Sequence, residues 1–238
     1  MLTAFDGART ELGVRDFASL LSVHKSTASR LAGTLAAHGF LERAPDGDRF
    51  RLGPEAARIG LSAVGGGLLL GAARPAMDAL AARTGETVVL SIPAGDEALH
   101  VAQAGSSYVV GATTWIGRRT PLHASSDGKV FLAFGGATLP SDGRPEALAP
   151  RTVTDFRKLE RQLARARHEG WASAVGEFEE GLNGVAAPVF AGGECVAALS
   201  VSGPAYRVPP ERLPALAELC VASARTVSDR LAVTEDAA

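Results

Sequence analysis

Apolar side chains near the start of the chain recur every three or four residues in two stretches, which predicts two short helices. In residues 14–23 the apolar positions of this pattern are Val14, Phe17, Leu20 and Leu21. In residues 25–37 they are Ala28, Leu31, Ala32 and Leu35, which we expect to form a buried stripe. A break at residues 22–24 separates the two helices, and Gly39 is placed to end the second one.

After Gly39 the pattern changes to short runs that are typical of strands. FLER at 40–43 and RFRL at 49–52 predict two strands, and Asp46 with Gly47 between them predicts the turn of a β-hairpin. Two helices followed by a hairpin form a winged helix-turn-helix, whose second helix lies in the major groove of DNA. We therefore expect a DNA-binding domain of this type at residues 1–53.

The remaining chain mixes helical and strand patterns. Residues 54–67 predict a linker helix that ends in the pliable joint GGG at 65–67, and residues 68–238 predict a second domain. Strands are expected at 86–92, 98–105, 107–115, 171–178, 184–191 and 194–203. Helices are expected at 68–84, where Pro75 should cause a kink or a new start, in the second half of 121–134, at 155–170 and at 210–233. Without a regular βαβ repeat, this order predicts the α+β class with an antiparallel or mixed sheet.

The composition is that of a soluble globular protein. Its 238 residues are 46% hydrophobic and 21% charged, the net charge is −2, and no apolar run reaches the roughly 20 residues of a membrane-spanning helix. Two cysteines do not form a disulfide framework in a chain of this size, and MLTAFDGART lacks the pattern of a signal peptide. We therefore expect a cytoplasmic protein without a membrane partner.

The second predicted helix begins with short polar and basic side chains, and no acidic residue occurs between Asp16 and Glu42. Its candidate DNA contacts are Lys25, Ser26, Thr27, Ser29 and Arg30, and Arg49 and Arg51 are expected to point outward from the hairpin as a wing. Such side chains neutralise phosphates or bond base edges. Serine and threonine at this place also serve simply as helix caps. His24 and His38 are expected to be surface or cap residues.

Patterns that would indicate an enzyme are missing from the sequence. There is no nucleophile elbow, no glycine-rich phosphate loop and no metal-ligand spacing among the histidines and cysteines. His123 and Lys129 have no evident nucleophile beside them, and the acidic run of Glu177, Glu179 and Glu180 is expected to be a solvated face. We therefore expect no catalytic residue, no metal and no cofactor.

Two polar segments of the second domain suggest a small-molecule pocket. Residues 125–128 are expected in a loop before a helix, where backbone N–H groups bind anions. Ser200 and Ser202 alternate with Val201 and should project from one sheet face. Buried hydroxyls need partners, so these serines either bond the backbone internally or line a pocket for a small acidic metabolite.

Five stretches resemble the IclR-type bacterial transcriptional regulators, and together they cover essentially the whole chain. They are KSTASRLAGTLAAHGFLER, RFRLGPEAARIG, TGETVVLSI, GRRTPLHASSDGKVFLA and EEGLNGVAAPVFAGGECVAALSVSGP. The resemblance implies a winged helix-turn-helix joined by a linker helix to a GAF-like effector-binding domain. It also implies an operator on double-stranded DNA, a small organic or aromatic acid as effector, and a homodimer or tetramer. Carried over by position, the effector contacts are Ser126, Asp127, Gly128, Asn183, Gly184, Ser200 and Ser202.

Two positions depart from the family pattern. This chain has Ala174 where several relatives place an acid, and Gly184 where many have a cysteine. A pocket without these groups is larger and less polar, so we expect an effector bulkier or more apolar than a two- or three-carbon acid. The alternative function is a metabolite-sensing GAF-like module whose degenerate N-terminal domain acts through a protein partner, and an enzyme is a third possibility.

Overall fold

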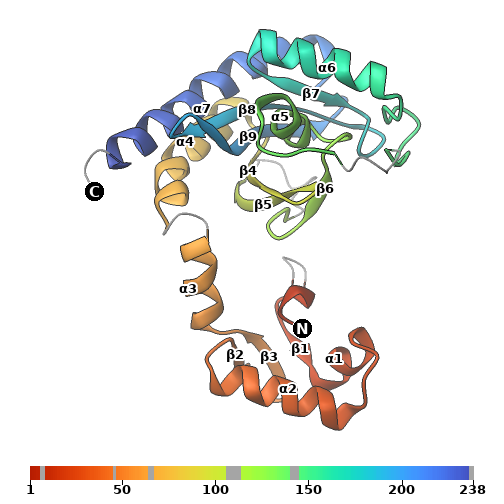
Figure 1. Cartoon of the computed structure of the whole chain (residues 1–238), viewed down its shortest axis with the longest axis vertical. Coiled ribbons are helices and arrows are strands. Elements are labelled where there is room, and N and C mark those ends of the chain that lie inside the picture. The colour runs from red at the N-terminus through yellow and green to blue at the C-terminus, as the bar shows by residue number, and fades with distance from the viewer. Residues whose placement is uncertain (6–8, 45–46, 64–66, 106–113, 140–144, 236–238) are drawn as a thin grey trace. The chain divides into compact units, whose positions relative to one another are not determined.

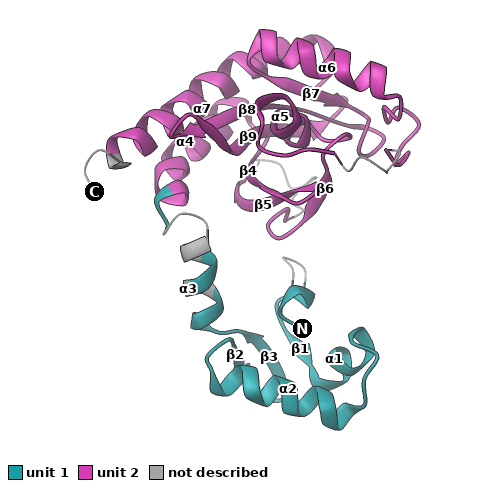
Figure 2. Ribbon diagram, in the orientation of Figure 1, with its two compact units in different colours: residues 1–68 teal, residues 69–238 magenta. Residues whose placement is uncertain are grey.

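The computed structural model describes residues 1–5, 9–44, 47–63, 67–105, 114–139 and 145–235. Backbone contacts divide the chain into two units, residues 1–68 and residues 69–238 (Figure 2). The predicted joint at 65–67 lies largely outside the described residues. In the described part of the chain, no helix has the length and apolar character needed to cross a bilayer.

The first unit contains the predicted helix pair and hairpin. Its elements are a 3₁₀ turn at Leu2–Ala4, β1 (Leu12–Gly13), α1 (Val14–Leu20), α2 (Lys25–Ala37), β2 (Leu41–Arg43), β3 (Arg49–Leu52) and α3 (Pro54–Ala63) (Figure 1). The three strands form an antiparallel sheet in the order β1-β3-β2. Strand β1 was not predicted, because two residues are too short to show a periodic pattern.

The core of the first unit is small and is built around aromatic rings. Phe17 of α1 is fully buried and lies 6.2 Å from the ring of Phe50 on β3, while Ala28 and Ala32 are the fully buried positions of α2. The expectation that Leu31 is buried was wrong, because 45% of this residue is exposed. It lies at the margin of the α2 stripe, beyond the reach of so small a core. Leu20 and Leu21 of α1 are exposed for the same reason.

The second unit is built on one antiparallel sheet of six strands, which confirms the α+β prediction. The strands are β4 (Thr87–Ala94), β5 (Glu97–Ala104), β6 (Arg119–Pro121), β7 (Ala172–Val175), β8 (Leu182–Ala191) and β9 (Glu194–Pro204), in the order β6-β5-β4-β9-β8-β7. The helices are α4 (Leu68–Thr84), α5 (Ser126–Phe134), α6 (Phe156–Glu169) and α7 (Leu213–Glu235), with a 3₁₀ turn at Pro210–Arg212. Most of the strand predicted at 107–115 lies outside the described residues.

Helices α5 and α6 pack on one face of this sheet over small side chains. Alternate positions of the strands point to that face, so Ala172 of β7, Ala186 of β8 and Ala198 of β9 join the helices in one core. The intervening positions, such as Val185 and Val201, face the other way and are also fully buried. Helix α7 packs along β8 and β9 (Figure 1). The sheet is therefore buried on both faces.

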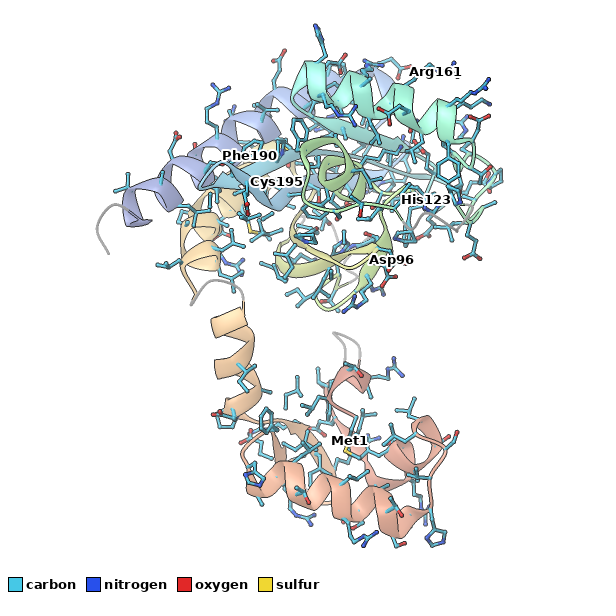
Figure 3. All side chains as sticks on the ribbon, in the orientation of Figure 1. Met1, Asp96, His123, Arg161, Phe190 and Cys195 are labelled. Carbon is cyan, nitrogen blue, oxygen red and sulfur yellow. The ribbon has the colours of Figure 1, made fainter. Side chains whose placement is uncertain are left out.

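Two details of the helices differ from expectation. Pro75 does not start a new helix, because it lies inside α4, which continues from Leu68 to Thr84; the alternative, a kink at Pro75, stays a prediction. Phe156 was expected in the apolar stripe of α6 but is half exposed, because it is the first residue of the helix. The stripe itself is formed by Leu159, Leu163 and Ala166, while Arg161 lies on the outer side of α6 (Figure 3).

Candidate functional site

The N-terminal turns of α2 carry polar and basic side chains, and a side chain caps the start of the helix. His24 is the N-cap, and its Nδ1 accepts a hydrogen bond from the Ser26 backbone N–H at 3.3 Å and lies 2.9 Å from Ser26 Oγ. The cap role expected of His24 is therefore observed. Lys25 and Arg30 are exposed, and neither pairs with a carboxylate among the described residues. Ser29 is also exposed and Thr27 is half-buried, so α2 brings all five candidate residues to its first turns.

The two arginines of strand β3 differ from the basic residues of α2 in having carboxylate partners. Both Arg49 and Arg51 are exposed, as expected of a wing, but each has a carboxylate partner. Arg49 Nη2 lies 3.3 Å from Asp16 Oδ2, and Arg51 Nε donates to Glu42 Oε1 at 2.6 Å. The Gly13 amide donates to Asp16 and lowers the pKa of this carboxyl, against an opposing effect of burial, and Arg49 adds to the lowering. The sequence pattern did not reveal these pairs.

A cavity of about 50 Å³ opens on the sheet face that also carries α5. Its lining consists of Val89, His100, Trp115, Thr120, Ser125, Ser126, Asp127, Ala174, Phe178, Leu182, Asn183, Gly184, Ser200 and Ser202. Six of the seven candidate effector contacts are among these residues. The cavity exists because Ala174, Gly184 and Ser202 are small and lie side by side across β7, β8 and β9.

Gly128 is the candidate that does not line the cavity. A Cβ on this residue would lie 2.4 Å from Leu122 Cα and 2.5 Å from the Leu122 carbonyl oxygen, so the glycine lets α5 approach the preceding loop. The expectation that residues 125–128 form a loop was also wrong. Ser125 is the N-cap of α5, and its Oγ accepts from the Gly128 N–H at 3.2 Å.

Asp127, in α5, forms a buried polar cluster with one residue from β4 and one from β5. Its Oδ2 accepts a hydrogen bond from Ser91 Oγ at 2.6 Å and lies 2.9 Å from His100 Nε2. Burial by itself would raise the pKa of the Asp127 carboxyl, but the hydrogen bond and charge of His100, with further hydrogen bonds from Ser91 and Ser125, lower it below its usual value. The carboxylate is thus ionised and is held by partners within the protein.

The serines of the cavity differ in their partners. Ser200 Oγ makes a long hydrogen bond to the Val89 carbonyl at 3.4 Å, and Asn183 Nδ2 donates to the Val208 carbonyl at 2.8 Å. Within the described residues, the hydroxyls of Ser126 and Ser202 make no such bond. Both lie close to Gly184, where a Cβ would be 3.5 Å from Ser126 Oγ and 3.2 Å from Ser202 Cβ. Two hydroxyls and the start of α5 therefore meet at one side of the cavity.

Sequence reasoning missed the aromatic side of the cavity. The ring of Trp115 lies 5.6 Å from His100 and 6.2 Å from Phe178, so three segments far apart in the chain contribute one wall. His100 is buried, whereas Trp115 and Phe178 are half-buried. The alternation of the predicted strand at 98–105 placed His100 on the same face as Ala98, and this was the one signal available.

Lys129 and Glu177 form a buried ion pair behind the cavity wall. Lys129 Nζ lies 2.6 Å from Glu177 Oε1, and burial lowers the pKa of Lys129 against the opposing effect of Glu177. The expectation of a solvated acidic run was wrong for Glu177, although Glu179 and Glu180 are exposed. His123, which is labelled in Figure 3, precedes α5. Its Nε2 lies 2.9 Å from the Glu146 carbonyl oxygen.

The described residues show no arrangement typical of a metal centre or a reactive thiol. No group of three or more histidine, cysteine, aspartate or glutamate side chains within them is placed to hold a metal ion. Burial raises the pKa of both Cys195 and Cys220 to about 12, so both thiols are protonated at neutral pH.

The chain is similar to known bacterial regulators over nearly its whole length. Residues 1–45 match the "IclR helix-turn-helix domain", and residues 63–229 match the "Bacterial transcriptional regulator IclR C-terminal". The HTH-type transcriptional regulator BhcR of Paracoccus denitrificans (strain Pd 1222) is 34% identical, over 95% of this chain and 83% of its own length. The regulator XynR of Escherichia coli (strain K12) is 32% identical, over 90% of this chain and 86% of its own.

A solved structure shows the same architecture with a ligand. An IclR homolog from Microbacterium hydrocarbonoxydans, crystallised in complex with 4-hydroxybenzoate, has a TM-score of 0.80 and 28% identity and covers 97% of this chain and 95% of its own. The family matches, the relatives and the shared fold agree with the helix pair of the first unit and with the helix-and-sheet architecture of the second. The chain therefore belongs to the IclR family of bacterial transcriptional regulators, which combine a helix-turn-helix domain with a C-terminal effector-binding domain.

Proposed function

We propose that this chain binds operator DNA through α2 and the β2–β3 hairpin, and that a small organic acid in the second unit controls this binding. Lys25 and Arg30 support the DNA contact, because both are exposed at the start of α2 and no carboxylate among the described residues neutralises them. The partial positive charge of the helix start adds to their attraction for phosphate. Thr27 and Ser29 are then placed to bond phosphate or base edges.

The observation that carries the effector proposal is the mixed lining of the cavity. The free hydroxyls of Ser126 and Ser202 lie beside Gly184 and near the start of α5, which suits a carboxylate. Trp115 and Phe178, which contact each other, add aromatic rings that suit an apolar ligand group. An aromatic acid satisfies both parts of the lining, and the relative from Microbacterium hydrocarbonoxydans was crystallised with such a ligand.

The size of the cavity also bears on the effector. A volume of about 50 Å³ holds about four water-sized groups, which is room for a carboxylate and the carbon that carries it. Trp115, Phe178 and Leu182 are half-buried apolar residues of the lining, so we place the larger, apolar part of the effector against them. Ala174 and Gly184 add no carboxylate and no thiol to the lining. These features support an effector bulkier or more apolar than a two- or three-carbon acid.

Regulation by such an effector requires an assembly and two states. A dimer, or a tetramer of two dimers, places two recognition helices on the half-sites of a pseudo-palindrome. The effector changes DNA affinity to the extent that it binds one arrangement of the domains more tightly than the other. A regulator of this kind acts on the bacterial chromosome, so we place the protein in the cytoplasm.

Two variants test the two halves of this proposal. Genomic duplexes retained by the parent chain are titrated by fluorescence anisotropy, with and without benzoate, 4-hydroxybenzoate or glyoxylate. Arg30→Ala should weaken DNA binding by about 5- to 150-fold, the range for losing an arginine contact to DNA. Ser202→Ala should leave the affinity for DNA within about twofold of the parent. It should lower the affinity for the acid by about tenfold, because a hydrogen bond to a charged group is lost.

Each variant serves as the control for the other, because each changes one unit only. Equal DNA affinity for Arg30→Ala and the parent chain would contradict the DNA contact. A clear preference for glyoxylate over the benzoates would contradict the proposed effector class. If the parent chain binds the acids but shows no DNA binding that weakens with salt, the protein-partner alternative is favoured.

A further inference from the structure

The basic residues expected to contact DNA fall into two groups in the structure. Lys25 and Arg30 on α2 have no carboxylate partner within the described residues, whereas Arg49 and Arg51 on β3 each have one. All four side chains are exposed, so burial does not explain the difference. The difference is therefore one of charge: α2 presents free cations and β3 presents cations that are already neutralised.

The two carboxylates are held in place by the fold. Glu42 lies directly opposite Arg51 in the antiparallel pairing of β2 with β3, which keeps its carboxylate within 2.6 Å of the guanidinium. Asp16 Oδ2 accepts a hydrogen bond from the Gly13 amide at 2.7 Å while it faces Arg49. Neither acid belongs to α2, so the pairing affects the wing without reducing the charge of the recognition helix.

A DNA phosphate approaching β3 competes with these carboxylates. Glu42 occupies only the Nε–H of Arg51, so a phosphate either displaces the carboxylate or binds the remaining Nη donors beside it. In both cases the carboxylate remains near the DNA as a like charge. Exposed ion pairs are weak, so a well-placed phosphate can displace the carboxylate, but an arbitrary encounter with the duplex gains little. Negative elements of this kind lower the affinity for the wrong partner more than for the right one.

We propose that Glu42 and Asp16 are built-in competitors of DNA phosphates for Arg51 and Arg49, and that they reduce the binding of non-operator DNA. This inference rests on the proposed DNA-binding function. The free cations of α2 then supply the general attraction to the duplex. The wing contributes only where the operator holds its phosphates in the correct place, so the two acids determine specificity.

The variant Glu42→Gln tests the proposal, because the amide keeps the size of the side chain and removes its charge. The full-length variant is titrated with a mixed-sequence duplex over a series of salt concentrations. We expect affinity at low salt to rise by about two- to fivefold, the equivalent of one exposed ion pair. The slope of log K against log salt should steepen by about 0.9, because Arg51 then neutralises one more phosphate.

The control is Glu97→Gln, which removes an acid of similar exposure from the Arg119–Glu97 ion pair in the second unit. It makes the same change of net charge, and its affinity should stay within about twofold of the parent. The inference would be overturned if Glu42→Gln did not raise the affinity for the mixed-sequence duplex, or if both variants raised it equally. A parent chain whose DNA binding does not depend on salt would instead refute the proposed function. Circular dichroism confirms that both variants are folded.

Asp16→Asn provides a second, independent measurement at the other end of β3. Asparagine keeps an oxygen that can accept from the Gly13 amide, so α1 retains its cap while Arg49 loses its charged partner. The same gain in affinity and in salt dependence is expected. Unchanged binding by both Asp16→Asn and Glu42→Gln would show that the wing arginines do not meet DNA.

Discussion

Gly128 shows how a single missing side chain sets the position of a functional helix. Because a Cβ there would overlap the Leu122 backbone, only glycine allows α5 to pack at its observed distance and to bring Ser126 to the cavity. The resemblance to relatives identified this residue as an effector contact, whereas the structure assigns it a packing role. Ser126, two residues earlier, lines the cavity.

Gly128→Ala should therefore destabilise the second unit. We expect a loss of about 1–3 kcal/mol in the free energy of unfolding, the usual effect of overpacking a well-packed site, measured by urea denaturation. Gly33→Ala is the matched control, since a Cβ there meets no atom within 4 Å and alanine favours a helix by up to about 1 kcal/mol. Equal stability of Gly128→Ala and the parent would refute the packing role.

Among the elements, α5 is tied to the turn between β7 and β8 by charge. Lys129 Nζ bonds both Glu177 Oε1 at 2.6 Å and the Ser173 carbonyl at 3.1 Å. Phe178, next to Glu177, lines the cavity, so the ion pair holds the aromatic wall in position. A buried pair of this kind specifies an arrangement more than it adds stability.

Glu177→Gln should be strongly destabilising, because it leaves the buried ammonium of Lys129 without its counter-charge. The expected loss is about 3–5 kcal/mol in the free energy of unfolding, measured by chemical denaturation. The double variant Lys129→Met with Glu177→Leu removes both charges and should recover most of this loss. If the single variant is as stable as the parent, the pair is not held in a buried site.

At the scale of the whole molecule, each unit contains an aspartate whose pKa the fold lowers: Asp16 in the first unit and Asp127 in the second. A carboxyl with a lowered folded-state pKa stabilises the protein above its unfolded pKa, and this stabilisation is lost as pH falls through the folded-state pKa. The side chain of Asp16 is 42% exposed, so solvent screening makes its contribution to stability small. Acid sensitivity should therefore arise mainly in the second unit.

Asp127→Asn tests this assignment through the pH dependence of unfolding. The ordinary pKa of the carboxyl is 3.8, so the parent should lose stability as pH falls below this value. The variant should be less stable at neutral pH and should show a flatter decline of the melting temperature toward about pH 3. Parallel pH profiles for the two proteins would mean that Asp127 does not contribute to acid sensitivity.

Much of the architecture could be predicted from local pattern, because helices and strands leave periodic signals in neighbouring residues. The helix pair, the hairpin, α6, α7 and five of the six strands of the large sheet follow from such signals. Strands β1 and β6 did not, since each has only two or three residues and, unlike β2, no predicted hairpin turn beside it. The prediction of burial was also wrong for residues at the margins of the apolar stripes, such as Leu31 and Phe156, because exposure there depends on the size of the core.

The sequence by itself determined the two kinds of unit, the acid-free start of α2 and, through the family resemblance, six residues that line the cavity. Only the tertiary structure decided which charges meet: Arg51 with Glu42, Lys129 with Glu177, and Arg207 with Glu86, whose positions differ by 121 along the chain. The physical reason is that an ion pair depends on distance in space. A linear pattern records spacing within one element, whereas packing alone brings distant elements together.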